Sequence, residues 1–391
     1  MALDPQQQRK RSLISGIAAL SLALAGGADT ASAAPVLMPS APPLPDAKSY
    51  ILMDFQTGQI IAEKNPNLQL PPASLTKLMT AYLAYGALAN GTLHWNQRIH
   101  VSRVAWHTGG SSLFIQPNLP VTVDQLMHGL IIDSGNDAAV ALAQAIAGSQ
   151  AALVNEMNAT ALKLGLHGTH YSDVDGLPTP DLHTSARDVA LISRDLIKKY
   201  PQIINISKLK SYRYNHITQR SWNPALFGHP SIDGLKTGHT HAAGYCMDTT
   251  AIRNGRRLIA VVMGTPSWSN GVNSVVALLD YGYHFTADHQ VTTAGKVVGI
   301  YSDTGLNPDK LPVAVANNVD VTIPKGAADH LSTKVSYRHV GVKTIQKDEA
   351  LGEMTVSLDG KVLAITPLVA TEAAKPAGTI GSLWNRVKQS L

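Results

Sequence analysis

Apolar and polar residues alternate from Ser49 to Glu63, on both sides of Thr57-Gly58, and this pattern predicts a β-hairpin. A second hairpin is predicted where Asn254-Gly255 separates the apolar runs Tyr245–Arg253 and Arg257–Gly264. Between the hairpins the apolar positions follow a helical period. The expected helices start near Ser74 and Thr122 and cover Ala138–Ala147, Ser185–Lys198 and 273–286. Helices inserted between an early hairpin and later strands predict an α+β fold, an antiparallel sheet covered by helices, over residues 47–286.

A different pattern follows from about His289. The chain becomes rich in Val and Thr, with short runs that read as strands: Val319–Ile323, Lys334–Tyr337 and Gly352–Leu358. Short strands without long helical stretches between them predict a separate small all-β domain. We expect this domain to cover residues 287–374.

The amino-terminal segment has the three parts of a secretory signal peptide. The basic cluster Arg9–Arg11 precedes an apolar run from Leu13 to Ala25, and small residues follow at Ala31-Ser32-Ala33. An uncleaved membrane anchor is the alternative, but the run is shorter than the roughly 20 residues that span a bilayer. We therefore expect residues 1–33 to be removed on export, and the Pro-rich stretch 34–46 to form an extended linker.

The carboxyl-terminal segment, residues 375–391, predicts an amphipathic helix. One face of the predicted helix would carry the apolar residues Ile380, Leu383, Trp384, Val387 and Leu391. Twelve helical residues reach only about 18 Å, so this helix cannot cross a membrane. We expect it to lie on a membrane surface, at the periplasmic, outer face of the inner membrane. The alternative is an ordinary terminal helix that docks on its own domain.

Composition narrows the function classes. The net charge is +5, with 45% apolar and 15% charged residues, which is a globular balance. No dense run of Lys and Arg is interleaved with aromatic residues, so nucleic-acid binding is not expected. Cys246 is the only cysteine, which excludes an intrachain disulfide.

Three short motifs carry the candidate chemistry. They are Ser74-Leu75-Thr76-Lys77, Ser134-Gly135-Asn136 and Lys236-Thr237-Gly238. Each motif is weak alone, because Ser207–Lys210 also matches the first and Ser221–Asn223 the second. Together and in this order they are typical of penicillin-interacting serine enzymes.

The residue types suit an acyl transfer. Ser74 and Lys77 would share one helix face, and a serine hydroxyl needs a neighbour such as a lysine of lowered pKa to take its proton. Ser134 and Asn136, in a break between two helices, could relay a proton and bind a substrate carbonyl. Lys236 and Thr237 beside Gly238 on a strand suit a closely approaching anionic group, and an edge strand could pair with an extended peptide. The alternatives are two helix caps, a solvated lysine and an unremarkable strand.

With their flanks the motifs resemble the low-molecular-mass penicillin-binding proteins of the D-alanyl-D-alanine carboxypeptidase type. The matching segments are 72–80, 132–138 and 233–240, with Gly110–Ser112 and His183–Asp188 in addition. The likeness is strong over 47–286 and looser beyond it. It implies a β-lactamase/transpeptidase-like catalytic domain, followed by a small all-β domain and a terminal helix.

The resemblance also implies a role for each residue. Ser74 would attack the carbonyl between the two terminal D-alanines of a peptidoglycan stem peptide, with Lys77 as the base, and Ser134 would pass a proton to the leaving D-alanine. Asn136 would bind the substrate amide, while Lys236 and Thr237 would position the terminal carboxylate. The N–H groups of Ser74 and His239 would form the oxyanion hole. β-Lactams should acylate the same serine, and no metal or cofactor is implied.

The chain departs from the family pattern in one place. Relatives commonly carry an arginine shortly after the strand that ends near Gly264, where it assists carboxylate binding. Residues Thr265–Gly271 contain no arginine. Arg213 or Arg220 could take this role.

Other functions remain open at this point. A β-lactamase or a D,D-endopeptidase would use the same serine chemistry. A zinc peptidase would need ligands such as the pairs His167/His170 and His239/His241, although the HExxH motif is absent. A non-catalytic cell-wall scaffold would not need Ser74.

Overall fold

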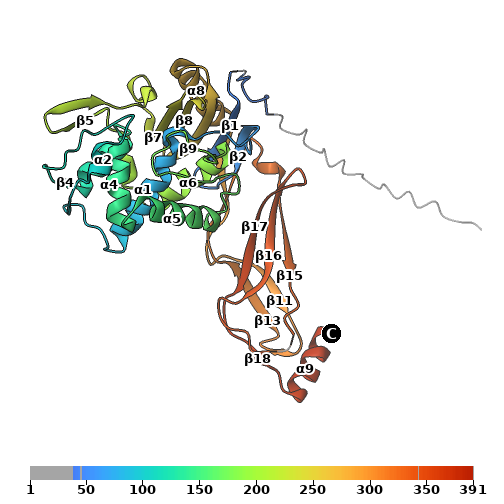
Figure 1. Cartoon of the computed structure of the whole chain (residues 1–391). Coiled ribbons are helices and arrows are strands. Elements are labelled where there is room, and N and C mark those ends of the chain that lie inside the picture. Colours follow the sequence, from blue (N-terminus) through green and yellow to red (C-terminus); the bar gives the residue numbers. More distant parts are fainter. Residues whose placement is uncertain (1–37, 45, 342, 391) are drawn as a thin grey trace, which may run out of the picture. The chain divides into compact units, whose positions relative to one another are not determined.

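The computed structural model describes residues 38–390 except 45 and 342. The predicted signal peptide and the start of the predicted linker lie outside the described residues. Along the described chain the element order agrees with the predicted α+β class, with helices set between an early hairpin and later strands (Figure 1).

A five-stranded antiparallel sheet forms the centre of the larger part. Its strands are β1 (Ser49–Asp54), β2 (Ile60–Lys64), β7 (Ile232–Thr240), β8 (Gly244–Arg253) and β9 (Arg256–Thr265), in the order β2-β1-β9-β8-β7. Both predicted hairpins are confirmed: β1 pairs with β2, and β8 pairs with β9 across Asn254-Gly255. Strand β7 lies at an edge of the sheet, so its outer side is available to the cleft described below.

Helices cover both faces of this sheet (Figure 1). Successive side chains of a strand point to opposite faces, so Ile51 packs into one apolar core and Leu52 into the other. The first core is built with α1 (Lys77–Ala89), α3 (Val123–Ile131), α4 (Asn136–Ala147), α5 (Gln150–Lys163) and α6 (Ala186–Lys199). The second core is built with α8 (Trp268–Phe285).

Helix starts follow from local capping. Thr122 forms a capping box with Gln125 at the start of α3, and Ser185 caps α6 through the Asp188 N–H. Two predicted starts were wrong by a few residues. Helix α8 begins at Trp268, where Ser267 caps it, five residues before the predicted 273. Ser74 lies in a 3-10 turn, η1 (Ala73–Thr76), and α1 itself begins at Lys77.

Short elements complete this part of the chain. They are β3 (Arg98–Ile99), α2 (Arg103–Trp106), β4 (Val121–Thr122), α7 (Ile203–Ser207), β5 (Ser211–Tyr214), β6 (Ile217–Arg220) and η2 (Pro224–Phe227). Strands β5 and β6 form a hairpin of their own.

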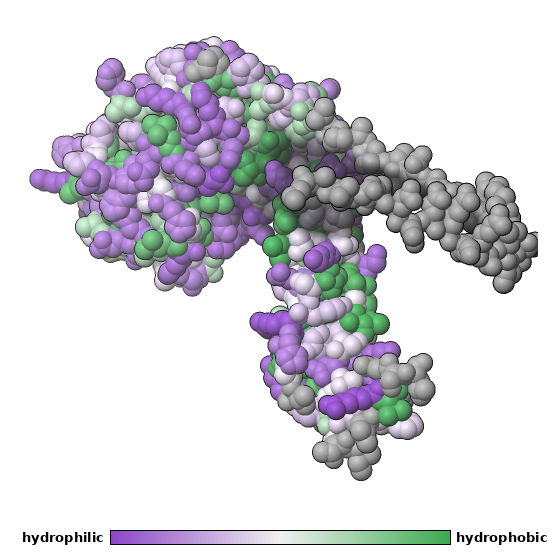
Figure 2. Space-filling view, turned by 90° about the vertical axis from the view of Figure 1, so that its right-hand side faces the viewer, coloured by the Kyte–Doolittle hydropathy of each residue, from purple (hydrophilic) through white to green (hydrophobic). Residues whose placement is uncertain are grey.

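The all-β expectation for the later residues is confirmed. Strands β11 (Val297–Ser302), β13 (Lys310–Val315), β17 (Lys361–Ala370), β16 (Ala350–Leu358) and β15 (Leu331–Tyr337) form one sheet in that order. Smaller pairs are β10 (Thr286–Thr292) with β14 (Val319–Pro324), and β12 (Leu306–Asn307) with β18 (Lys375–Pro376); η3 (Ala328–His330) precedes β15. A separate apolar core includes Val313, Met354 and Leu368. Apolar side chains also reach the surface here among polar ones (Figure 2), among them Val297, Ile300, Val362 and Ile365.

The described chain ends in helix α9 (Thr379–Ser390), as the sequence predicts. Asn385 donates hydrogen bonds to the carbonyl oxygens of Thr304 and Leu306, which ties the helix to a turn of the β-rich part. In the described residues no individual helix has the length and apolarity of a membrane span; α4 and α5 pass such a test only jointly, with a bend of 82° between them.

Candidate active site

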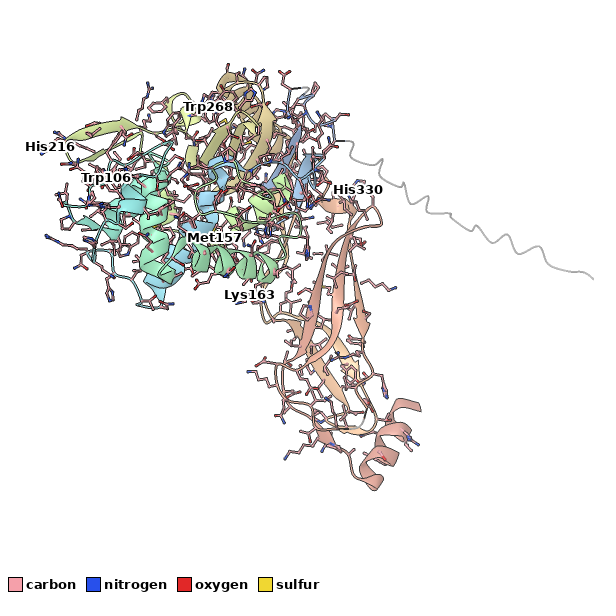
Figure 3. All side chains as sticks on the ribbon, viewed as in Figure 1. Trp106, Met157, Lys163, His216, Trp268 and His330 are labelled. Atoms are coloured by element: carbon pink, nitrogen blue, oxygen red, sulfur yellow. The ribbon has the colours of Figure 1, made fainter. Side chains whose placement is uncertain are left out.

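A cleft of about 370 Å³ brings the three motifs together. It lies where the edge strand β7, the turn η1 and the α3–α4 connection meet. The lining residues are Ser74, Gly110, Ser111, Ser134, Trp222, Thr237, Gly238, His239 and Trp268. Trp268 stands at the start of α8 (Figure 3).

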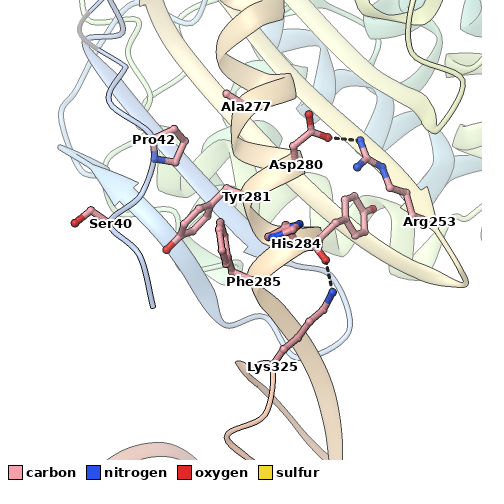
Figure 4. A pocket seen from close by; sticks show the side chains of 10 residues that line it. Ser40, Pro42, Arg253, Ala277, Asp280, Tyr281, His284, Phe285 and Lys325 are labelled. Atoms are coloured by element: carbon pink, nitrogen blue, oxygen red, sulfur yellow. Dashed lines mark hydrogen bonds and ion pairs between the residues drawn. The ribbon is translucent and has the colours of Figure 1, made fainter. Parts of the chain in front are cut away.

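A larger cavity of about 650 Å³ contains no residue of the motifs. Figure 4 shows it against the outer side of α8, where Tyr281 and Phe285 lie beside Pro42 and the Arg253–Asp280 ion pair. The cleft at Ser74 is the better candidate because it combines a hydroxyl nucleophile with neighbouring cationic and polar groups.

Glycines allow the backbone to close around Ser74. A Cβ on Gly238 would lie 2.9 Å from the Pro72 carbonyl oxygen and 3.0 Å from the Ser74 nitrogen. A Cβ on Gly176 would lie 1.9 Å from the carbonyl oxygen of Ala73, whose φ of +48° is itself unusual for alanine. Strand β7 and the 172–181 loop can therefore approach η1 only because these positions lack side chains.

Lys77 is completely buried, with 0% exposure. Its Nζ donates to Ser74 Oγ at 2.9 Å, to Asn136 Oδ1 at 2.6 Å and to the carbonyl oxygen of Asp175 at 2.6 Å. Burial lowers the pKa of Lys77 to about 8, although nearby carboxylates, first that of Asp175, act in the opposite direction. At pH 7, one unit below this pKa, about a tenth of Lys77 is therefore uncharged and able to accept the Ser74 proton.

Ser134 sits in a strained turn between α3 and α4, with φ of +57°. Ser111 Oγ donates to the Ser134 carbonyl oxygen at 2.7 Å, and the Asn136 N–H donates to the Ser111 carbonyl oxygen at 2.7 Å. The Ser134 hydroxyl faces the cleft, where Lys236 Nζ donates to its oxygen at 2.9 Å. The turn thus holds a second hydroxyl in the same cleft as Ser74.

Asn136 and Lys236 lie behind the cleft wall. Both polar atoms of the Asn136 amide form hydrogen bonds, because Oδ1 accepts from Lys77 and Nδ2 donates to the Gly109 carbonyl oxygen at 2.7 Å. Lys236 is 2% exposed and donates to Ser134 Oγ and to the carbonyl oxygen of Thr237. Burial, together with the Lys77 charge, lowers the pKa of Lys236 well below its ordinary value, and Asp133 opposes this shift.

The other residues of the third motif face the cleft directly. Thr237 Oγ1 donates to the Trp222 carbonyl oxygen at 3.2 Å, and Gly238 follows on the same strand. The His239 ring stacks on Tyr245 with centroids 4.0 Å apart, and Trp268 meets Tyr245 edge-on at 5.0 Å. In the described part of the chain no arginine lines this cleft, and Arg220 lies 3.8 Å above the Phe227 ring instead.

Sequence reasoning missed several contributors to the site. Asp175 holds Lys77 through its backbone carbonyl, which leaves no signature in a sequence. Ser111 fixes the Ser134 turn, although only its segment, and not its role, had been recognised. Trp222 and Trp268 line the cleft without belonging to any motif.

The second copies of the motifs serve ordinary structural roles. Ser207 Oγ donates to the Asp233 carbonyl oxygen, and Asn223 caps the turn η2. Within the described residues, no three His, Cys, Asp or Glu side chains gather as a metal site would require.

Comparisons with known proteins agree over both parts of the chain. Residues 37–267 match the model of the D-alanyl-D-alanine carboxypeptidase family, and residues 287–376 match that of the C-terminal domain of penicillin-binding protein 5. The D-alanyl-D-alanine carboxypeptidase DacD of Salmonella typhimurium is 36% identical, with 96% of this chain and 97% of that protein covered. DacA of Escherichia coli K12 is 34% identical, with 90% of this chain and 89% of that protein covered.

Solved structures show the same relationship. Penicillin-binding protein 5 from Haemophilus influenzae is 31% identical, with a TM-score of 0.81 over 86% of this chain and 100% of that one. Penicillin-binding protein 6B from Escherichia coli is 35% identical, with a TM-score of 0.71 over 86% of this chain and 98% of that one. The fold, the ordered motifs and these relatives together establish that the chain belongs to the D-alanyl-D-alanine carboxypeptidase family.

Proposed function

We propose that this protein is a serine-type D-Ala-D-Ala carboxypeptidase that removes the terminal D-alanine from peptidoglycan stem pentapeptides and so limits cross-linking. One observation carries the proposal: the buried Lys77 Nζ lies 2.9 Å from Ser74 Oγ, with a pKa lowered to about 8. This pair supplies an activated hydroxyl without a metal ion or a histidine.

Acylation begins when uncharged Lys77 takes the Ser74 proton and Ser74 Oγ forms a bond to the carbonyl carbon between the two D-alanines. The N–H groups of Ser74 and His239 stabilise the oxyanion. The carbon–nitrogen bond then breaks, and the leaving amine takes a proton from Ser134, which recovers one from Lys77. The products are the Ser74 ester and free D-alanine.

Deacylation uses the same groups with water as the nucleophile. Lys77 accepts a proton from the water, the hydroxide oxygen bonds to the ester carbon, and Ser74 leaves with a proton returned by Lys77. The shortened peptide departs with a new carboxylate. β-Lactams enter the same route, because their strained amide offers Ser74 an equivalent carbonyl.

Substrate binding follows from the cleft walls. An extended stem peptide pairs with the edge strand β7, and its terminal carboxylate lies against Thr237 and His239. Gly238 lets the peptide approach the strand closely. Lys236 lies behind the cleft wall and acts on the bound substrate through Ser134 and through the positive potential of its ammonium group. Asn136 binds the substrate amide and also holds Lys77. The leaving D-alanine lies towards Trp268.

The two terminal segments determine where in the cell the protein is located. Residues 1–33 act as a signal peptide and 34–46 as a linker, while 47–286 form the catalytic domain and 287–374 the small β-rich domain. Residues 375–391 attach the protein peripherally to the outer face of the inner membrane, with Trp384, which is 61% exposed, in the interface. Flotation with anionic vesicles tests this: we expect Trp384→Ala to weaken vesicle binding, and a full chain that fails to float would contradict it.

The activity is tested with a synthetic pentapeptide that ends in D-Ala-D-Ala. We expect the exported protein to release one D-alanine per peptide, and Ser74→Ala to release none. Cleavage of a cross-linked dimer alone would favour a D,D-endopeptidase, and rapid turnover of penicillin would favour a β-lactamase. A folded protein that does none of these would favour a cell-wall scaffold.

A further inference from the structure

Strands β5 and β6 form an antiparallel hairpin with His216 at its tip (Figure 3). Tyr212 on β5 lies opposite Gln219 on β6, and both side chains point to the inner face of the hairpin. Tyr212 stacks on His128 of α3 with ring centroids 4.9 Å apart, and Gln219 Nε2 donates to the Ser112 carbonyl oxygen at 3.0 Å. These two contacts hold the hairpin against the helices that surround the cleft.

The outer face of this hairpin is basic. Side chains alternate between the two faces of a strand, so the outer face carries the exposed residues Ser211, Arg213, Thr218 and Arg220. Residues 196–232 contain no Asp or Glu. Among the described residues, neither Arg213 nor Arg220 forms an ion pair. Both guanidinium groups are therefore available to an anionic partner.

Arg220 is held in an orientation that suits a carboxylate. Its guanidinium carbon lies 3.8 Å above the centre of the Phe227 ring in the turn η2. An arginine that stacks on an aromatic ring keeps the N–H groups at the edge of its guanidinium plane free, and these match the two oxygens of a carboxylate. The stacking also limits the side-chain freedom that binding would otherwise remove.

The outer face of the hairpin adjoins the catalytic cleft. Trp222, two residues after Arg220, lines the cleft and is 50% exposed. Its carbonyl oxygen accepts from Thr237 Oγ1 at 3.2 Å. Two extended residues cover about 7 Å, so the chain reaches Arg220 a short distance beyond the cleft wall. A substrate that is longer than the cleft can therefore meet the basic face where it passes Trp222.

We propose that the outer face of the β5–β6 hairpin binds carboxylate groups of the peptidoglycan strand whose stem peptide occupies the cleft. The inference rests on the proposed function, which makes this polymer the substrate. Free carboxylates recur along such a strand, whereas a short pentapeptide is held by the cleft itself. An anionic lipid surface is the other polyanion that a basic face could meet. The position next to the cleft favours the polymer.

The test compares two substrates of the full exported protein. One is insoluble peptidoglycan that contains pentapeptides, and the other is the soluble synthetic pentapeptide. The measured quantity is the ratio of the initial rates of D-alanine release, polymer over peptide. We expect Arg213→Gln/Arg220→Gln to lower this ratio by a factor of about 3 to 10, the contribution of two exposed ion pairs. Salt at about 0.5 M should remove the difference from the wild type, because it screens exposed charges.

Matched variants separate local charge from net charge and from folding. Lys334→Gln/Lys361→Gln removes the same charge from exposed positions of the β-rich part and should leave the ratio at the wild-type value. Arg213→Gln alone keeps the stacking of Arg220 on Phe227 and should lower the ratio about twofold. If thermal unfolding shows that the double variant is not folded, this single variant decides.

A binding measurement separates this inference from the proposed function. Ser74→Ala should co-sediment with insoluble peptidoglycan, and adding Arg213→Gln/Arg220→Gln should weaken this binding at low salt. If the proposed function fails, the wild type releases no D-alanine from the short peptide, and the sedimentation result alone decides the inference.

Two results would overturn the inference. An equal loss of activity on both substrates would show that the arginines act on the terminal carboxylate in the cleft. Unchanged release and sedimentation with the polymer would show that the hairpin does not bind it, and weaker flotation of the same variant with anionic vesicles would then assign the basic face to lipid.

Discussion

Lys236 on β7 donates a hydrogen bond to Ser134, 102 residues earlier in the chain, over 2.9 Å. This contact joins the edge strand of the sheet to the turn between α3 and α4. At the same cleft, Lys77 donates a hydrogen bond to Ser74 over 2.9 Å. Two buried lysines therefore each donate to a serine that lines the cleft, and the charge of Lys77 contributes to the lowered pKa of Lys236.

Lys77 is expected to be indispensable, and the chain offers a matched control. Lys77→Met removes the proton acceptor, so penicillin acylation should fall by a factor of about 10²–10⁴. Lys210→Met changes the exposed lysine of the second S-x-x-K sequence, Ser207–Lys210, and should leave the rate unchanged. Stopped-flow measurement of acylation compares the two. Equal rates for both variants would exclude Lys77 as the base.

The acylation rate should rise with pH. Lys77 must lose its proton to act, and its pKa is lowered to about 8, so the rate should reach half its maximum near pH 8. The Asp175 carboxylate favours the charged lysine. Asp175→Asn keeps an acceptor for the Leu177 N–H but removes the charge, so the midpoint should move to lower pH. A midpoint that stays or rises would contradict this electrostatic account.

Gly238 is expected to tolerate no side chain. In Gly238→Ala the new Cβ would meet the Pro72 carbonyl oxygen and the Ser74 nitrogen at about 3 Å, and both belong to backbone that cannot rotate away. The strand must then move from η1, with acylation lost and stability lowered by roughly 1–3 kcal/mol. In Gly228→Ala the Cβ meets nothing within 4 Å. Penicillin labelling and thermal unfolding should separate the two variants; an active Gly238→Ala would refute the close approach.

Asp248 should make the protein less stable as the pH rises. It is fully buried, and burial raises its pKa to about 7 despite a hydrogen bond from Ser193. The folded state therefore binds this proton more tightly than the unfolded state, and the free energy of unfolding falls between about pH 4 and pH 7. In Asp248→Asn the decrease in the free energy of unfolding between these pH values should be smaller by roughly 2–4 kcal/mol. Urea titrations at several pH values measure the free energy of unfolding, and an unchanged pH dependence would show that Asp248 is not responsible.

Much of the fold and the motif residues could be predicted because local signals were strong. Asn254-Gly255 specified a hairpin, and strict helical periods marked α3 and α6. The start of α8 was predicted late because Gly271 and polar residues interrupt the apolar pattern in its first turns. Helix α5 was not predicted because few of its residues are buried, so its apolar stripe is narrow.

The details of the site depend on contacts that side-chain patterns do not encode. The Asp175 carbonyl oxygen on Lys77 and the positive φ of Ala73 arise from tertiary packing. Lys236 donates to Ser134 and Asn136 accepts from Lys77, two contacts that connect the motifs to one another and that the sequence alone did not predict. Their expected roles in substrate binding remain predictions.

The most direct test of the account is the mass of the intact protein after incubation with penicillin, followed by peptide mapping. We expect one adduct per chain on Ser74 in the wild type and none in Ser74→Ala of equal thermal stability. An adduct on another residue, or a folded wild type that forms no adduct, would contradict the central claim that Ser74 is the nucleophile.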